Sequence, residues 1–128
     1  MNKKKTPKAA AVIDIGSSVL KMRISQLKKG EIADLDRLTY PISLGHEVFT
    51  DGSISFQSVR EMSKALSGFK ALMQEYGITE YRAVATTAIR EAQNRAFVLD
   101  QIHIQNGFTV EVLEDAEEKT LIYSEILD

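Results

Sequence analysis

The spacing of apolar and polar residues predicts that the first third of the chain is made of strands. Short apolar runs rich in β-branched residues lie at about residues 10–15, 19–28 and 31–42. Gly30 is typical of a tight turn between two strands. Pro41 marks the edge or the end of the third run, because proline has no N–H to donate to a neighbouring strand. We therefore expect three strands that follow one another as a meander.

From Ser55 the apolar residues recur every three or four positions, which is the period of a helix. We expect Ser53 or Ser55 to be the N-cap and Gly77 to follow the last turn. Gly68 lies inside this helix at a cost of about 1 kcal/mol relative to alanine, so we expect it to mark a close contact. The preceding segment, residues 43–52, has two glycines and is predicted to be a loop. The stripe expected to lie in the core consists of Phe56, Val59, Met62, Leu66, Phe69, Leu72, Met73 and Tyr76.

The rest of the chain alternates between strand-like and helix-like patterns. We predict strands at residues 78–85 and 108–113, and between them a helix capped by Asn94 that runs to about residue 106. A last helix begins near Glu114, where acidic residues would offset the positive end of the helix dipole. The apolar residues expected to be buried here are Tyr81, Ala83, Val84, Phe97, Val98, Leu99 and Ile102. The order βββαβαβα predicts an α/β fold: a mixed five-stranded sheet with helices on its faces, as in ribonuclease H-like folds.

Composition narrows the class of protein without identifying a function. The 128 residues suffice for one domain, and 44% of them are apolar. The net charge of −2 indicates neither a nucleic acid nor an anionic membrane as partner. The chain has no cysteine, which excludes disulfides and thiolate sites, and no apolar run approaches the roughly 20 residues of a membrane span. We expect a cytoplasmic protein.

We divide the chain into a disordered basic arm at residues 1–9 and a single domain at residues 10–128. The arm is rich in lysine, and a solvated tail and a contact with polyanions are its two alternatives. The last helix reaches Asp128 without a glycine or proline to end it, so we expect the chain to stop while an element is under way.

The turn after the first strand is the first candidate for chemistry. Gly16 permits a turn tight enough to bring the backbone close to a ligand. Ser17 and Ser18 offer hydroxyls and backbone N–H groups, which are the donors that hold a phosphate. Asp14 adds a carboxylate beside which a hydrated Mg²⁺ ion fits. The alternative is a plain hairpin with a polar turn.

Two further candidates also follow strands, and ligands of open α/β sheets bind outside strand ends. Arg90, behind two threonines, offers a fork of N–H donors for phosphate, and the acidic turn at residues 114–118 offers a base for water. Together with the first turn they predict hydrolysis or transfer of a phosphoryl group. Alternatively, Arg90 pairs with Glu91, and Glu117 and Glu118 only stabilise a helix N-terminus.

Together these stretches resemble the N-terminal half-domain of the exopolyphosphatase and guanosine pentaphosphate phosphohydrolase (Ppx/GppA) family, within the actin and sugar-kinase superfamily. The similar segments are residues 12–18, 44–45, 83–94 and 112–123, in the order of the family. Thr-Ala-Ile-Arg-Glu-Ala-Gln-Asn, residues 87–94, is the most specific of them.

The resemblance implies a ribonuclease H-like (actin-like ATPase) half-domain that acts with Mg²⁺ on inorganic polyphosphate or guanosine pentaphosphate (pppGpp). Asp14 would lie near the metal and the phosphate under attack, and Arg90 would hold phosphate oxygens. Glu118 matches the glutamate that acts as general base, with Glu117 as the weaker candidate. The first phosphate loop would consist of Gly16, Ser17 and Ser18. The second loop is expected beyond the chain, so we expect the isolated chain to be inactive, and a homodimer of the full-length protein stays open.

Some residues depart from the family pattern. Ser18 stands where asparagine is usual, Glu114-Asp115 where Ser-Gly is usual, and Lys119-Thr120 where Ala-Arg is common. The added negative charge would repel a polyanion. An alternative function is therefore a polyphosphate- or nucleotide-binding sensor of the same fold with weakened catalysis. A kinase or actin-like ATPase fits residues 86–94 less well.

Overall fold

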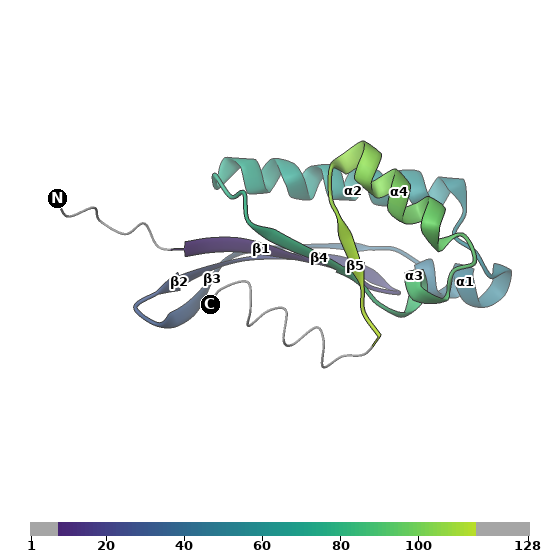
Figure 1. Cartoon of the computed structure of the whole chain (residues 1–128), viewed down its shortest axis with the longest axis horizontal. Helices are drawn as coiled ribbons and strands as arrows, with labels where there is room; N and C mark the ends of the chain where they lie inside the picture. Colours follow the sequence, from purple (N-terminus) through teal and green to yellow (C-terminus); the bar gives the residue numbers. More distant parts are fainter. Residues whose placement is uncertain (1–7, 115–128) are drawn as a thin grey trace.

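The computed structural model describes residues 8–114, and its centre is one five-stranded sheet in the order β3-β2-β1-β4-β5 (Figure 1). The strands are β1 (Lys8–Ile15), β2 (Val19–Lys28), β3 (Glu31–Pro41), β4 (Tyr81–Ala85) and β5 (Val110–Val112). β1, β2 and β3 form an antiparallel meander. β4 pairs in parallel with β1 on one side and with β5 on the other. The predicted mixed sheet is confirmed, and the carboxyl ends of β1, β4 and β5 lie at the same edge.

Within residues 8–114, four helices accompany the sheet: α1 (Leu44–Asp51), α2 (Phe56–Glu75), α3 (Thr87–Glu91) and α4 (Arg95–Asn106). The two long helices, α2 and α4, lie side by side over one face, while the short α1 and α3 lie at one end of the sheet (Figure 1). Asn106 fastens the long pair, because its side-chain amide donates to the carbonyl of Ser63 and to the hydroxyl of Ser67, both at 2.9 Å. The predicted last helix lies outside the described residues.

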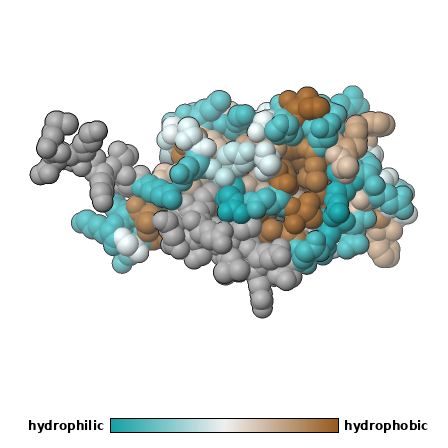
Figure 2. Space-filling view, viewed as in Figure 1, coloured by the Kyte–Doolittle hydropathy of each residue, from teal (hydrophilic) through white to brown (hydrophobic). Residues whose placement is uncertain are grey.

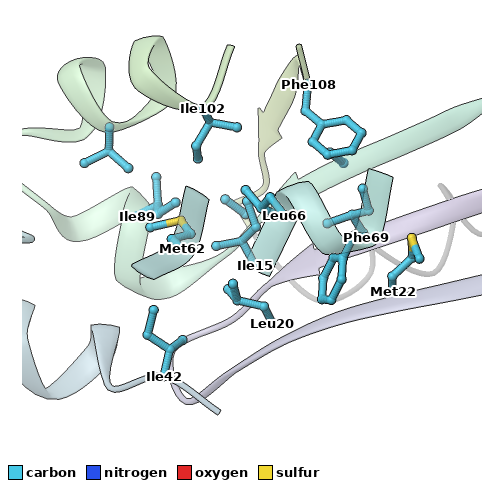
Figure 3. Packing of buried hydrophobic residues seen from close by; sticks show 14 of the residues in the cluster. Ile15, Leu20, Met22, Ile42, Met62, Leu66, Phe69, Ile89, Ile102 and Phe108 are labelled. Atoms are coloured by element: carbon cyan, nitrogen blue, oxygen red, sulfur yellow. The ribbon is translucent and has the colours of Figure 1, made fainter. Parts of the chain in front are cut away.

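The hydrophobic core lies between the sheet and the two long helices (Figure 3). Alternation along β1 turns Ile13 and Ile15 toward this side, where they are fully buried. α2 contributes Met62 and Leu66, and α4 contributes Ile102. Burial of a side chain of this size stabilises the fold by about 2 kcal/mol. The core therefore fixes the sheet and α2 as a rigid frame for the segments at the strand ends.

The segment predicted to be a loop before α2 is instead the helix α1, so this prediction was wrong. Leu44 packs into the core, which gives the short helix its anchor. Gly45 lies in its first turn, where it contacts another segment, and Gly52 ends the helix with φ 77°. The two glycines that indicated a loop therefore serve a close contact and a helix end.

The predicted core stripe of α2 is correct in its middle and wrong at its ends. Phe56 is 74% exposed, and Phe97 and Tyr76 are exposed as well. Phe56 and Phe97 occupy the first turns of their helices and pack edge to face on each other, with ring centroids 5.5 Å apart. A Cβ on Gly68 would meet nothing within 4 Å, so the close contact expected there is absent.

The predicted ends of α2 are confirmed. The Ser55 side chain accepts from the Ser58 N–H at 3.1 Å as the N-cap of α2, and Gly77 follows the helix with φ 67°. β1 begins at Lys8, two residues before the expected start, because it pairs with Leu27 of β2. β4 and β5 are shorter than expected, since their pairing covers only the residues that have a parallel neighbour.

The surface combines hydrophilic residues with a band of hydrophobic ones on the face that Figure 2 shows. Exposed apolar side chains include Phe49 of α1 and Ile104 of α4. Within residues 8–114, none of the helices combines the length and the apolarity that crossing a bilayer requires.

Candidate functional site

The structure brings the three predicted segments to one edge of the sheet. Ile15, Ala85 and Val112 are partners in register, so β1, β4 and β5 end at the same level. Backbone hydrogen bonds continue past this level: Thr86 N–H donates to Ile15 O at 3.3 Å, and Leu113 N–H donates to Ala85 O at 2.8 Å. The segments that begin at residues 16, 86 and 113 therefore leave the sheet side by side, which confirms the predicted arrangement as far as Glu114.

The turn after β1 is tight, as predicted. Gly16 N–H donates to Val19 O at 3.1 Å, and a Cβ on Gly16 would lie 3.0 Å from that oxygen. Only glycine leaves room for this turn without displacing the strand that follows. Ser18 is exposed at the tip, and its carbonyl accepts from Ile42 N–H at 3.0 Å. The turn thus presents the Ser18 side chain outward on a fixed backbone.

Gly45 supports this turn from behind, a contact that sequence reasoning did not foresee. Its N–H donates to Ser17 O at 2.9 Å. A Cβ at this position would lie 2.8 Å from the Ser17 Cβ, closer than real Cβ atoms approach. The Leu44-Gly45 pair belonged to the family resemblance, which was the only signal of its importance, and the structure supplies the reason.

Glu47, in the first turn of α1, reaches the beginning of α2. Its carboxylate accepts the N–H of Ser55 and the hydroxyl of Ser58, the latter at 2.5 Å. Burial would raise the pKa of Glu47, but these two hydrogen bonds outweigh burial and lower the pKa below its ordinary value. Nothing in the sequence pattern indicated this link between the two helices.

A cavity of about 730 Å³ opens between the turn after β1 and the beginnings of α1 and α2. Its wall combines hydroxyls with two carboxylates, and the residues from these three elements include Ser17, Ser18, Gly45, Glu47, Ser58 and Glu61. The Glu61 carboxylate accepts the Tyr40 hydroxyl at 3.0 Å. The predicted phosphate loop therefore borders this cavity.

Asp14 lies at the end of β1 and is only 5% exposed. Alternation along the strand places it on the opposite face from Ile13 and Ile15, away from α2 and α4. Its partners in register are Lys21 of β2 and Val84 of β4. The predicted site carboxylate is thus at the expected strand end. Residues 8–114 contain no group of three or more side chains suited to holding a metal ion.

Arg90 joins the end of α3 to the chain that leaves β5. One guanidinium nitrogen donates to Leu113 O at 2.6 Å and to Glu114 O at 3.1 Å. The alternative pairing with Glu91 is also present, but at 3.5 Å it is a weak contact. The side chain is 22% exposed. Arg90 is therefore beside the third segment, as predicted, and its interactions within residues 8–114 are with backbone carbonyls and with neighbouring side chains.

Asn94 lies at the end of the stretch 87–94, which also contains Arg90. It occupies the N-cap position of α4, as predicted, but its side chain makes no cap hydrogen bond. Instead it accepts from Ile54 N–H at 3.0 Å and donates to Ile54 O at 2.8 Å. Gln93 N–H adds a hydrogen bond to Gly52 O at 2.8 Å. The stretch 87–94 thus fastens the α1–α2 connection at one end and the exit of β5 at the other.

The predicted base, Glu118, and its neighbour Glu117 lie outside the described residues. The structure places Glu114, from which they follow, beside the guanidinium of Arg90. The role of Glu118 therefore stays a prediction.

Comparison with known proteins identifies the family. Residues 23–127 match the Ppx/GppA phosphatase family, and because this match covers most of the chain, the chain belongs to that family. The resemblance inferred from the strand-end segments is thereby confirmed.

Individual relatives are similar over almost the whole chain. A crystal structure of the Aquifex aeolicus member of the Ppx/GppA family superposes with a TM-score of 0.86 and 30% identity over 94% of this chain and 40% of that one. Exopolyphosphatase 2 of Mycobacterium tuberculosis is 29% identical over 88% of this chain and 38% of its own length. A guanosine-5'-triphosphate,3'-diphosphate pyrophosphatase of Aliivibrio fischeri is 24% identical over 91% of this chain and 24% of its own length. The chain thus spans between 24% and 40% of the length of these three relatives.

Proposed function

We propose that this chain forms one wall of the active site of a phosphohydrolase that releases terminal phosphate from inorganic polyphosphate or pppGpp. One observation carries the proposal: in a member of the Ppx/GppA family, the turn after β1, the Arg90 segment and the exit of β5 leave the sheet together at one edge. The names of the relatives support both substrates, since one is an exopolyphosphatase and another acts on the guanosine compound.

The residues at this edge suit hydrolysis of a phosphoryl group. The loop formed by Gly16, Ser17 and Ser18 would surround phosphate oxygens with N–H and hydroxyl donors. Arg90 would stabilise the negative charge, and Glu118 would orient the attacking water and accept its proton. Phosphoryl transfer depends mainly on such positioning, so donors on one wall alone are insufficient. We therefore expect the isolated 128-residue chain to be inactive.

Mg²⁺ is the cofactor we propose, and Asp14 is the residue that would bind it. The described residues hold no group of three or more side chains suited to a metal ion, but Mg²⁺ commonly binds to one or two protein carboxylates together with substrate phosphates and water. A single strand-end carboxylate beside a phosphate loop fits that ligand set. When bound, the ion would neutralise phosphate charge and orient the substrate.

Release of inorganic phosphate by the intact protein tests the proposal. The protein is incubated with polyphosphate or with pppGpp, with and without Mg²⁺, and compared with a Glu118→Gln variant. We expect release that requires Mg²⁺ and falls about 100-fold or more in the variant. Glu31→Gln, which removes an exposed carboxylate at the start of β3, is the control and should retain the activity. Release that is unchanged in Glu118→Gln would contradict the assigned base.

The second candidate is a sensor that binds these polyanions and hydrolyses them poorly. Glu114 is exposed beside Arg90, where its charge would weaken the hold on phosphate, and this observation favours the candidate. Binding of either compound without phosphate release would support it. For both candidates we propose a cytoplasmic protein without nucleic acid or membrane as partner.

A further inference from the structure

We propose that Glu47 is a positioning residue for the phosphate loop: it fixes α1 to α2, and α1 in turn holds Ser17 in place. The inference deepens the proposed function and rests on it for its catalytic consequence. Its structural part stands independently, because it concerns hydrogen bonds within the described residues.

The helices α1 and α2 differ in how many side chains they bury in the core. α2 buries Val59, Met62, Leu66, Phe69 and Met73 against the sheet and α4. Of the eight residues of α1, only Leu44 is buried, and Val48 packs against the core while partly exposed. A short helix with one buried and one partly buried apolar side chain has little apolar contact to resist tilting or sliding. Its orientation therefore depends on polar contacts as well.

Glu47 supplies the polar contact that connects α1 to the rigid helix. One carboxylate oxygen accepts the backbone N–H of Ser55, the N-cap residue of α2, and the other accepts the hydroxyl of Ser58 in the first turn. Because both oxygens are used and both donors belong to α2, the carboxylate is held in one orientation. Hydrogen bonds to a charged acceptor are the stronger kind.

Gly45, two residues before Glu47, connects α1 to the phosphate loop. Gly45 precedes Glu47 in the same helical turn, and its N–H donates to Ser17 O at 2.9 Å. The Gly45 backbone lies so close to Ser17 that a Cβ would be 2.8 Å from the Ser17 Cβ. A small displacement of α1 therefore breaks this hydrogen bond or pushes the loop. In the intact site, a shift of about 1 Å can lower a rate about 100-fold.

The cavity beside the loop offers a matched control. Glu61 lines the same cavity as Glu47, but its described hydrogen bond is to Tyr40 at the end of β3, and it makes none to α1. Glu61→Gln thus removes the same charge from the same cavity without releasing α1. Ser58→Ala is the converse variant, because it leaves the charge of Glu47 in place and removes one of its two donors.

Amide hydrogen exchange at Gly45 and steady-state kinetics of the intact protein test the inference. In Glu47→Gln we expect exchange of the Gly45 amide to accelerate about tenfold, because a neutral amide makes weaker hydrogen bonds with Ser55 and Ser58 than the carboxylate does. We expect kcat for phosphate release to fall about tenfold with KM nearly unchanged. Ser58→Ala should change both quantities in the same direction, and the double variant should add little to Glu47→Gln. Glu61→Gln should leave Gly45 exchange unchanged.

The outcomes separate the inference from the proposed function. Absence of phosphate release from the unsubstituted protein would overturn the proposed function, while the exchange experiment would still decide whether Glu47 holds the loop. Unchanged Gly45 exchange in Glu47→Gln overturns the inference. So does an equal effect of Glu61→Gln, which would indicate charge alone, or a fall of kcat in Glu47→Gln that Ser58→Ala does not share.

Discussion

Asn94 and Ile54 exchange two hydrogen bonds, although 40 residues separate them in the sequence. The Asn94 side chain accepts from Ile54 N–H at 3.0 Å and donates to Ile54 O at 2.8 Å. An amide is the group that can do both at once. The pair fastens the connection between α1 and α2, which borders the cavity beside the phosphate loop, to the beginning of α4.

Replacing Asn94 by Asp should destabilise the protein although the shape hardly changes. A carboxylate keeps the acceptor for Ile54 N–H but loses the donor for Ile54 O, and it brings a charge to a half-buried position. We expect the free energy of unfolding to fall by about 1–3 kcal/mol, as measured by denaturant titration. Gln93→Glu, at the exposed neighbour, introduces the same charge and should cost far less. Equal losses in the two variants would contradict the role of the amide.

Two glycines in helices should respond in opposite ways to replacement by alanine. Gly68 of α2 has open space around its missing Cβ, so Gly68→Ala should stabilise the protein by about 0.5–1 kcal/mol through helix propensity. Gly45 of α1 gains the same propensity, but its Cβ would be 2.8 Å from the Ser17 Cβ. We expect Gly45→Ala to destabilise the protein and to displace the loop. Thermal unfolding of both variants checks this, and stabilisation by Gly45→Ala would show that the contact is dispensable.

Arg90→Lys should separate the geometry of the guanidinium from its charge. Lysine keeps the positive charge but lacks the planar fork that donates to Leu113 O and Glu114 O. We expect a loss of about 1–2 kcal/mol in the free energy of unfolding. Arg60→Lys, on the exposed side of α2, is the matched control and should be nearly neutral. An Arg90→Lys variant as stable as its control would leave phosphate binding as the main role of Arg90.

Acid should weaken the contact between β4 and β5. Arg82 donates two hydrogen bonds of 2.6 Å to the Glu111 carboxylate. These bonds lower the pKa of Glu111 below its ordinary 4.5, although burial opposes them. Because the folded pKa is the lower one, the stabilisation is present above pH 4.5 and is lost as the pH falls through the folded value. Glu111→Gln should therefore flatten the decline of stability in this acid range, and an unchanged decline would contradict the assignment.

The regular elements were predictable because local patterns and tertiary burial agree there. Ile13 and Ile15 alternate with Asp14 at the end of β1, and Met62 and Leu66 repeat at helical spacing, so the sequence indicates both the element and a buried face. Phe56 was misplaced because periodicity does not show where a helix extends past its packing partner. The helix α1 was missed because Gly45 was taken for a loop residue, whereas its missing Cβ makes room for Ser17.

The sequence predicted the candidate site residues but not the residues that hold them in position. Asp14, Ser18 and Arg90 are recognisable by type and by position after strands, and the structure places them near one sheet edge. Glu47 and Asn94 act through hydrogen bonds to residues outside their own helices, and no helix or strand periodicity indicates such pairs. The phosphate-binding and catalytic roles themselves stay predictions.

We propose above that the three strand-end segments act on one phosphate. The most direct test of this proposal is phosphate release from pppGpp and polyphosphate by the intact protein and by Asp14→Asn, Arg90→Gln and Glu118→Gln variants. Glu80→Gln, just before β4 and thus at the opposite edge of the sheet, is the control. We expect release to fall at least about 100-fold in each of the three variants and to stay unchanged in the control. Release that survives in the three variants as it does in the control would contradict the proposal.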